Sequence, residues 1–198
     1  MKKEIEIKMQ LTSVELDILK AWLKEKSRFV RSIHHIEYYL NNPKFSFHFD
    51  RDGLKDSNDY LRIRMTEKED SVCLKKFFPD PNVPGRHTHC DEYETEVKDG
   101  KVLLELMAQL GYTDVTIIDK IREEYMYLDF EVVIDDVKDL GTFVEIELKK
   151  DCEDVKAGHK EIKDFIKILG ITKYKELYRG YVSMFWNPSI DYGEDRVI

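Results

Sequence analysis

The sequence predicts an α+β fold in which helices pack against an antiparallel sheet. Two observations carry this prediction. Short runs of residues alternate between charged and aliphatic side chains, as half-buried strands do, and turn residues separate these runs. A few longer stretches instead place their apolar residues at helical spacing.

Four stretches have the spacing of helices. The first follows Thr12, which is expected to form a capping box with Glu15, and two others stop at Gly111 and Gly170, residues typical of the position after a helix. The fourth is amphipathic and contains two aromatic residues near its end. The helices are expected over about residues 14–28, 101–110, 153–169 and 173–186.

The strands are separated by turn signals such as Asp52-Gly53. Three prolines and a glycine in residues 79–85 are incompatible with a central strand and predict an exposed loop. Strands are expected at residues 4–8, 36–40, 45–49, 60–65, 72–78, 92–97, 118–127, 128–135 and 142–149.

Length and composition predict one domain over residues 1–186, with 187–198 as a C-terminal tail. The first residues lack the apolar core of a signal peptide, and no stretch approaches the ~20 apolar residues of a membrane span, so a cytoplasmic location without membrane contact is expected. The three cysteines have no paired spacing and are interpreted as free thiols. A net charge of -8 argues against nucleic-acid binding.

The strongest pattern is a pair of similar segments, Glu4-Ile5-Glu6-Ile7-Lys8 and Glu145-Ile146-Glu147-Leu148-Lys149. In a strand, each segment puts two carboxylates and an ammonium on one face and aliphatic residues on the other. Other strands separate charge in the same way. This pattern fits an ordinary open sheet with a solvated face. Because the polar faces are nearly all ionised, with acids and bases grouped by strand, it also fits a closed barrel whose interior binds a polyanion through metal ions.

In order and type, these strands resemble the CYTH superfamily of triphosphate tunnel metalloenzymes, which includes class IV adenylate cyclases and thiamine triphosphatases. The resemblance spans most of the chain. Its motifs, in order, are Glu4-x-Glu6-x-Lys8, Tyr39 before Asn41-Asn42-Pro43, Leu61-Arg62-Ile63-Arg64, Leu74-Lys75, Glu92-Tyr93-Glu94, Lys120-Ile121-Arg122, Asp135 and Leu140-Gly141-Thr142-Phe143-Val144-Glu145-Ile146-Glu147. Two features depart from the family pattern. Thr172-Lys173-Tyr174 stands where the family often has Lys-x-Ser-Tyr or Arg-Ser-Tyr, and the His-Phe pair that precedes the first motif in some cyclases is absent.

The resemblance implies a closed, eight-stranded antiparallel β-barrel, a tunnel with a charged lumen and helices outside. It implies Mg²⁺ or Mn²⁺ held by Glu4, Glu6, Glu145 and Glu147, with Glu94 and Asp135 as further ligands or as groups that orient metal-bound water. It assigns the catalytic and phosphate-binding roles to basic residues, with Tyr39 as a further substrate contact. The basic residues are Lys8, Arg62, Arg64, Lys75, Lys120 and Arg122.

The implied partner is a small-molecule triphosphate, and three functions remain open. The first is a class IV adenylate cyclase that converts ATP to cyclic AMP and pyrophosphate, which the chain length and the segment 120–147 favour. The second is a hydrolase of tripolyphosphate or of an organic triphosphate, and the third is a module that binds polyphosphate or nucleotides without turnover. The sequence leaves monomer and homodimer open. His34-His35 and His87-Thr88-His89-Cys90 lack a four-ligand zinc spacing and are interpreted as incidental.

Overall fold

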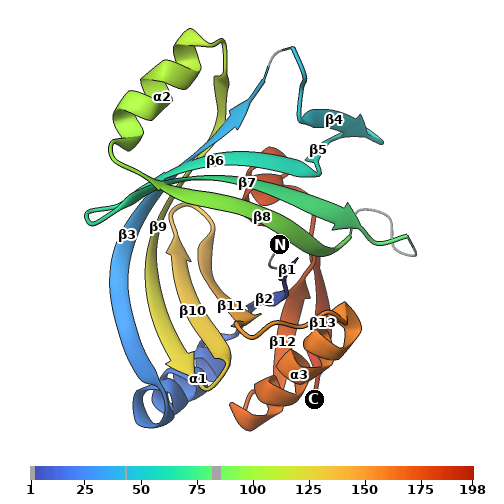
Figure 1. Cartoon of the computed structure of the whole chain (residues 1–198). Coiled ribbons are helices and arrows are strands. Elements are labelled where there is room, and N and C mark those ends of the chain that lie inside the picture. Colours follow the sequence, from blue (N-terminus) through green and yellow to red (C-terminus); the bar gives the residue numbers. More distant parts are fainter. Residues whose placement is uncertain (1–2, 43, 82–85) are drawn as a thin grey trace.

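The computed structural model describes residues 3–42, 44–81 and 86–198 (Figure 1). Its helices are α1 (Ser13–Lys26), α2 (Gly100–Gln109), α3 (Val155–Ile168) and α4 (Tyr181–Trp186). Its strands are β1 (Lys3–Glu4), β2 (Glu6–Gln10), β3 (Arg28–Asn41), β4 (His48–Arg51), β5 (Leu54–Ser57), β6 (Asp59–Met65), β7 (Asp70–Pro79), β8 (His87–Val97), β9 (Thr113–Tyr127), β10 (Phe130–Val137), β11 (Gly141–Leu148), β12 (Lys173–Leu177) and β13 (Gly193–Val197). None of the helices in the described part of the chain has the length and apolar character needed to cross a membrane.

Local signals in the sequence set the ends of the first three helices. The Thr12 hydroxyl accepts a hydrogen bond from the Glu15 amide, and Asp99 and Asp154 cap α2 and α3 in the same way. Gly111 and Gly170 follow α2 and α3 with φ angles of 89° and 79°, a conformation that side-chain-bearing residues adopt at a cost. These three helices agree with the sequence prediction to within about two residues at most ends.

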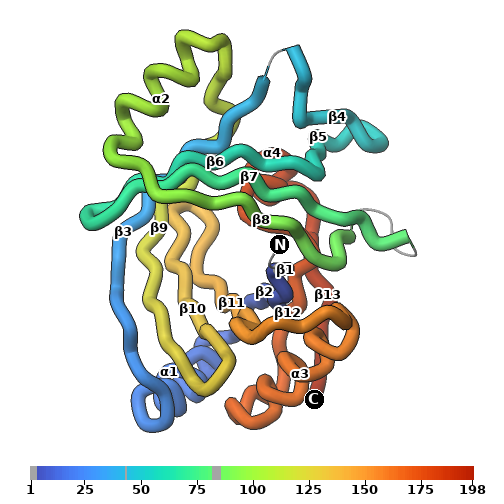
Figure 2. Tube along the Cα trace, in the orientation of Figure 1, coloured from blue at the N-terminus to red at the C-terminus, as the bar shows by residue number. Residues whose placement is uncertain are grey.

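The main sheet has eleven strands in the order β1-β8-β7-β6-β3-β9-β10-β11-β2-β12-β13, and every pairing in it is antiparallel. It is strongly curved, and β3, β9 and β10 form one wall while β6, β7 and β8 cross above (Figures 1 and 2). A separate hairpin, β4–β5, projects at one side.

A closed barrel of eight strands is not confirmed, because the pairing order has two ends, β1 and β13. The first segment of the chain nevertheless contacts both halves of the sheet. Residues 3 and 4 pair with β8, whereas β2 pairs with β11, and Ile5 lies between the two pairings. Both edges of β2 are paired, one with β11 and the other with β12, so only the two residues of β1 pair with β8. The part of the sheet that ends in β8 and the part that contains β2 therefore meet along a very short seam at β1.

Two cores hold this arrangement. The larger core packs α1 and α3 against the aliphatic face of β2, β10 and β11, with Leu19, Phe165 and Ile146 among its fully buried side chains. The smaller core packs α4 against the opposite side of the sheet through Tyr181 and Phe143. The charged face of β2 and β11 is thereby directed into the curve of the sheet, on the side that α4 also enters.

The prediction of one helix over residues 173–186 is wrong. Residues 173–177 form β12, in which Tyr174 and Glu176 are buried and Lys173 and Lys175 are more exposed, and only residues 181–186 are helical. In the predicted C-terminal tail, residues 193–197 form β13, which pairs with β12 over five residues. Of the predicted loop at 79–85, residues 82–85 lie outside the described residues, as does Pro43 of the predicted turn.

Candidate active site

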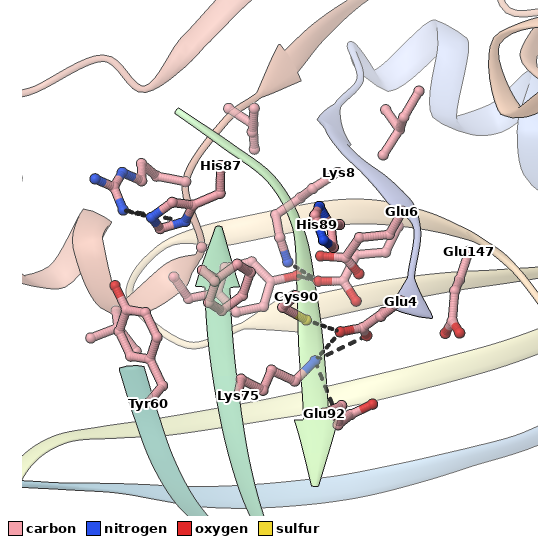
Figure 3. Close-up of a pocket in the computed structure, with 18 of the residues that line it drawn as sticks. Glu4, Glu6, Lys8, Tyr60, Lys75, His87, His89, Cys90, Glu92 and Glu147 are labelled. Atoms are coloured by element: carbon pink, nitrogen blue, oxygen red, sulfur yellow. Dashed lines mark hydrogen bonds and ion pairs between the residues drawn. The ribbon is translucent and has the colours of Figure 1, made fainter. Parts of the chain in front are cut away.

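A cavity of about 280 Å³ lies inside the curve of the sheet. All but one of the residues that the sequence selected line it, although they come from eight strands, and Figure 3 labels five of them. These are Glu4, Glu6, Lys8, Tyr39, Arg62, Arg64, Lys75, Glu94, Lys120, Arg122, Glu145 and Glu147. The remaining one, Asp135, lies directly behind the cavity wall and contacts two of its cations.

Strand register orders one wall of the cavity into rows. Tyr60 of β6 is the partner of Lys75, Arg62 is the partner of Tyr39, and Arg64 is the partner of Glu37. Each row lies about 7 Å from the next, because residues two apart on a strand point to the same face. Moving along β6, the wall therefore changes from aromatic at Tyr60 to strongly basic at Arg62 and Arg64.

The opposite wall carries the carboxylates. Glu6 and Glu147 are direct partners across β2 and β11, and so are Lys8 and Glu145, whose side chains form an ion pair. Burial, followed by the nearby charge of Glu4, raises the pKa of Glu147 to about 7 against the opposing effect of Lys149. Carboxylates facing one another across a strand pair repel unless a cation lies between them. This donor set of hard oxygens therefore fits Mg²⁺ or Mn²⁺, and Glu4, Glu6, Glu145 and Glu147 are the residues that would hold the ion.

Glu4 is held in place by two neighbours at the seam of the sheet. Lys75 Nζ lies 2.9 Å and 2.7 Å from its two carboxylate oxygens, and the Cys90 thiol donates a hydrogen bond of 2.8 Å (Figure 3). Burial acts to raise the pKa of Glu4, but Lys75 and Cys90 outweigh it and lower the value to about 2. Lys75 also lies 3.3 Å from Glu92, so two carboxylates flank this ammonium.

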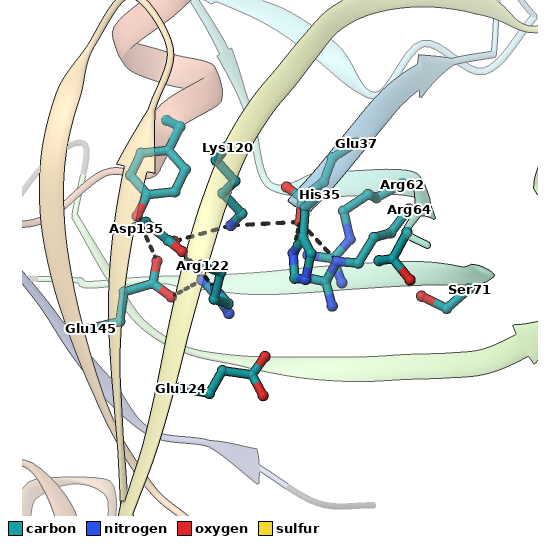
Figure 4. A network of polar contacts seen from close by, with 12 residues as sticks. His35, Glu37, Arg62, Arg64, Ser71, Lys120, Arg122, Glu124, Asp135 and Glu145 are labelled. Carbon is teal, nitrogen blue, oxygen red and sulfur yellow. Dashed lines mark hydrogen bonds and ion pairs between the residues drawn. The ribbon is translucent and has the colours of Figure 1, made fainter. Parts of the chain in front are cut away.

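Three of the cations share one fully buried carboxylate, Glu37 (Figure 4). Arg64 Nε donates to it at 2.9 Å, and Arg62 and Lys120 each approach one of its oxygens to 3.6 Å. Burial opposes ionisation of Glu37, yet these three cations hold its pKa well below the ordinary value. Glu37 is thus an anion at neutral pH that gathers basic side chains from β6 and β9.

Asp135 is a second buried carboxylate that holds cationic side chains, those of Lys120 and Arg122. Arg122 donates to both of its oxygens, at 2.7 Å and 2.5 Å, and Lys120 donates at 3.1 Å. The Tyr181 hydroxyl from α4 donates to Asp135 at 2.8 Å and lies 3.2 Å from Glu145. Asp135 is fully buried, so the structure places it as the anchor of Lys120 and Arg122, and its proposed role as a metal ligand remains a prediction.

Glu94, the other predicted further ligand, lies among cations. Arg62 donates to it at 3.1 Å and Ser71 at 2.9 Å, and Arg64 approaches to 3.9 Å. It belongs to the basic wall of the cavity, in the row of Tyr39 and Arg62, and not to the carboxylate wall.

The basic wall also perturbs Lys120. Its ammonium is almost fully buried, and burial together with nearby Arg122 lowers its pKa to about 7 in spite of Glu37 and Asp135. An anion that entered beside Lys120 and Arg122 would reduce the mutual repulsion of these cations.

The end of the cavity near Tyr60 is lined by aromatic side chains. Tyr60 stacks on Trp186 of α4, and the Phe77 ring stacks on His87, whose imidazole lies 2.9 Å from an Arg179 nitrogen. Tyr60, Phe77, His87 and Arg179 all line the cavity. This end offers flat apolar rings beside hydrogen-bonding groups.

Among the residues that hold the charged side chains in place, sequence reasoning missed Glu37 and Tyr181. Glu37 lies two positions before Tyr39, which the sequence did select, so the period of two along β3 was a usable signal. Tyr181 carried no such signal, because its role depends on the entry of α4 into the curve of the sheet.

Comparisons with known proteins identify the family of this chain. The family model described as CYTH domain matches residues 2–181. A Methanocaldococcus jannaschii protein named "Putative adenylate cyclase" is 27% identical over 184 residues, which cover 91% of this chain and 97% of the relative.

Solved structures share the fold. A Pyrococcus horikoshii protein superposes with a TM-score of 0.71 at 21% identity, covering 90% of this chain and 97% of that one. A Hippeastrum protein superposes with a TM-score of 0.66 at 14% identity, covering 96% and 98%. With the family model matching nearly the whole chain and the site residues gathered in one cavity, we conclude that this chain belongs to the CYTH domain family.

Proposed function

We propose that this protein is a divalent-metal-dependent enzyme that acts on the triphosphate group of a nucleotide, and that it converts ATP to cyclic AMP and diphosphate. One observation carries the proposal. Five cations from β6, β7 and β9 face the same cavity as four carboxylates suited to a hard metal ion from β1, β2 and β11, and Lys8 lies beside these carboxylates. The name of the Methanocaldococcus jannaschii relative supports the cyclase reaction.

The charges of the site match a metal-bound triphosphate. Nine lysine and arginine side chains line the cavity together with eight glutamates, and Asp135 lies behind the wall. These formal charges balance, and two divalent ions would add four positive charges. A nucleoside triphosphate carries about four negative charges at neutral pH, so metal and substrate together would keep the site close to neutral, whereas either one alone would not.

When bound, the metal would neutralise phosphate charge and orient the oxygens that react. The chain's own cations would hold the phosphates: Arg62 and Arg64 can bind phosphate oxygens with two nitrogens each, and Lys75 and Lys120 act as point charges. Glu37 and Asp135 keep these cations aimed at the cavity. Catalysis of phosphoryl transfer depends mainly on such positioning and charge stabilisation.

The aromatic end of the cavity supports a nucleotide over inorganic tripolyphosphate. Tyr60 and Phe77 lie one row or more before the basic rows of the wall, so a base stacked there would leave its phosphates beside Arg62 and Arg64. Stacking of a base on an aromatic ring is worth about 1–3 kcal/mol. Inorganic tripolyphosphate has no group that could use these rings.

Cyclisation and hydrolysis differ in the attacking oxygen. In cyclisation the 3′-hydroxyl oxygen bonds to the α-phosphorus and its proton passes to water, while the bond from the α-phosphorus to the oxygen bridging the α- and β-phosphates breaks and diphosphate leaves with that oxygen. In hydrolysis a water attacks a terminal phosphorus. The Hippeastrum protein is described as a putative adenylyl cyclase with a dominant triphosphatase activity, but at 14% identity it supports only the fold of this chain.

A product assay tests the proposal. Purified protein is offered ATP, tripolyphosphate and thiamine triphosphate separately, with Mg²⁺ or Mn²⁺, and cyclic AMP, diphosphate and phosphate are resolved by anion exchange. Glu147→Gln serves as the inactive variant and Glu105→Gln, on the exposed face of α2, as its matched control. Cyclic AMP with equimolar diphosphate supports the cyclase. Phosphate without cyclic AMP would make the protein a hydrolase, and metal-dependent binding without turnover would make it a binding module.

A further inference from the structure

A second cavity, of about 540 Å³, adjoins the first beyond the basic rows. Its lining includes Arg31, His35, Thr66 and Ser71, none of which lines the first cavity. Arg64 and Glu94 line both cavities and lie 3.9 Å apart. The two cavities are therefore separated by an arginine and a carboxylate, not by a hydrophobic wall.

His35 marks the second cavity as a place for a polar ligand. The imidazole is 1% exposed, and neither ring nitrogen has a hydrogen-bond partner among the described residues. Its Nδ1 lies 3.8 Å from a Glu37 oxygen, within reach of an ion pair but too far for a hydrogen bond (Figure 4). Since a buried polar group without a hydrogen bond costs about 1–3 kcal/mol, a ligand or bound water that satisfies His35 would recover this energy.

The lining offers groups of both signs. Arg31 donates to Glu124 at 2.7 Å and to the rim residue Glu69 at 2.9 Å, and Ser71 donates to Glu94. Hydroxyls and guanidinium groups bind phosphate oxygens, whereas carboxylates bind a hard divalent cation. A bare anion would meet repulsion from Glu69 and Glu94, but a phosphate group that carries its own metal ion would find partners for both of its charges.

The position of the second cavity further limits which ligand can reach it. Along β6 the rows run from Tyr60 through Arg62 and Arg64 to Thr66, and along β7 in the opposite direction from Lys75 to Ser71. A nucleotide with its base at the aromatic end would thus point its terminal phosphates toward the second cavity. The group that reaches it first is the one released from that end of the substrate.

We propose that the second cavity binds inorganic diphosphate together with its divalent cation, and that diphosphate leaves the main cavity by this route. The identity of the released group rests on the proposed cyclase reaction. The binding itself does not require turnover, so the two proposals can fail separately.

The test measures binding at residues that line only the second cavity. Histidine-selective ¹³C NMR follows the Cε1 resonance of His35, assigned with His35→Gln, while diphosphate and Mg²⁺ are added to the full-length protein. Calorimetry of the same titration gives the dissociation constant for wild type and for Arg31→Ala and Ser71→Ala. Arg28→Ala, an exposed arginine on the same strand, removes the same charge outside both cavities and is the control.

We expect the His35 resonance to shift with diphosphate, and Arg31→Ala to weaken diphosphate binding at this site at least tenfold while Arg28→Ala leaves it within twofold. In an active protein, Arg31→Ala should raise the inhibition constant of diphosphate while leaving the KM for ATP within twofold. An unmoved His35 resonance at saturating diphosphate, or equal affinity in Arg31→Ala and Arg28→Ala, would overturn the proposal. A shifted, Arg31-dependent resonance in a protein that makes no cyclic AMP would retain the site and reject the cyclase.

Discussion

Neutralising Glu37 should lower the free energy of unfolding more than neutralising any other single carboxylate of the site. It is completely buried and is the nearest counter-charge of Arg64, at 2.9 Å, and a second counter-charge for Arg62 and Lys120. In Glu37→Gln, Arg62 retains Glu94 and Lys120 retains Asp135, so the loss falls mainly on Arg64.

Removing one partner of a buried ion pair costs about 3–5 kcal/mol. We expect the lower end, about 3 kcal/mol, because the side chain of Arg64 is 19% exposed and water can partly replace Glu37. For a chain of this length each kcal/mol corresponds to about 2–4 °C, so the Tm of Glu37→Gln should fall by roughly 6–12 °C.

Differential scanning calorimetry of metal-free protein measures this change, with Glu105→Gln as the exposed control. Because the cations left by Glu37→Gln repel one another, tripolyphosphate should raise the Tm of the variant more than that of the wild type. A Tm within about 2 °C of wild type would show that Glu37 does not organise the cations.

Three further changes follow from other contacts. The pKa of Glu147 is raised to about 7 in the folded state against 4.5 in the unfolded chain, so the folded protein binds the proton more tightly and the free energy of unfolding without metal should fall by ~3 kcal/mol as pH rises from 4.5 to 7. In urea titrations Glu147→Gln should remove this loss, and the variant should also bind Mn²⁺ more weakly. A pH profile of stability that is the same in Glu147→Gln and wild type would contradict the assignment. Lys75→Ala removes one of the nine cations that line the cavity and should raise the KM for triphosphate at least tenfold in steady-state kinetics, whereas an unchanged KM would exclude it from substrate binding. Tyr181→Phe deletes the hydroxyl between Asp135 and Glu145 and should cost about 1–3 kcal/mol in chemical unfolding, with no cost arguing that water replaces it.

Much of the fold followed from local signals in the sequence. Capping residues such as Asp154 and the glycines after α2 and α3 act within a few residues of one another, and alternation of charged and apolar side chains predicted most strands of the main sheet. The segment 173–186 misled because Tyr174, Leu177, Tyr178 and Tyr181 have helical spacing, whereas the outcome depended on pairing of β12 with β2 and β13.

The charged residues of the cavity were predicted where they share a strand period, as Arg62 with Arg64 and Lys120 with Arg122 do, and the resemblance to the family assigned their roles. Residues whose role depends on distant contacts escaped prediction. His35 was interpreted as incidental, yet it is buried beside Glu37, and Cys90 became part of the site only because β8 reaches Glu4 at the seam. Both outcomes are set by tertiary pairing between segments more than eighty residues apart or by the curvature of the sheet.

Binding of a non-reactive ATP analogue, with and without Mn²⁺, measures most directly whether one cavity uses metal and cations together. Calorimetry should give an affinity for α,β-methylene-ATP that falls at least a hundredfold on chelation with EDTA, and at least tenfold in both Arg64→Ala and Glu147→Gln. Equal affinity with and without metal, or an unchanged affinity in either variant, would contradict a site in which carboxylates, metal and basic residues hold the triphosphate jointly.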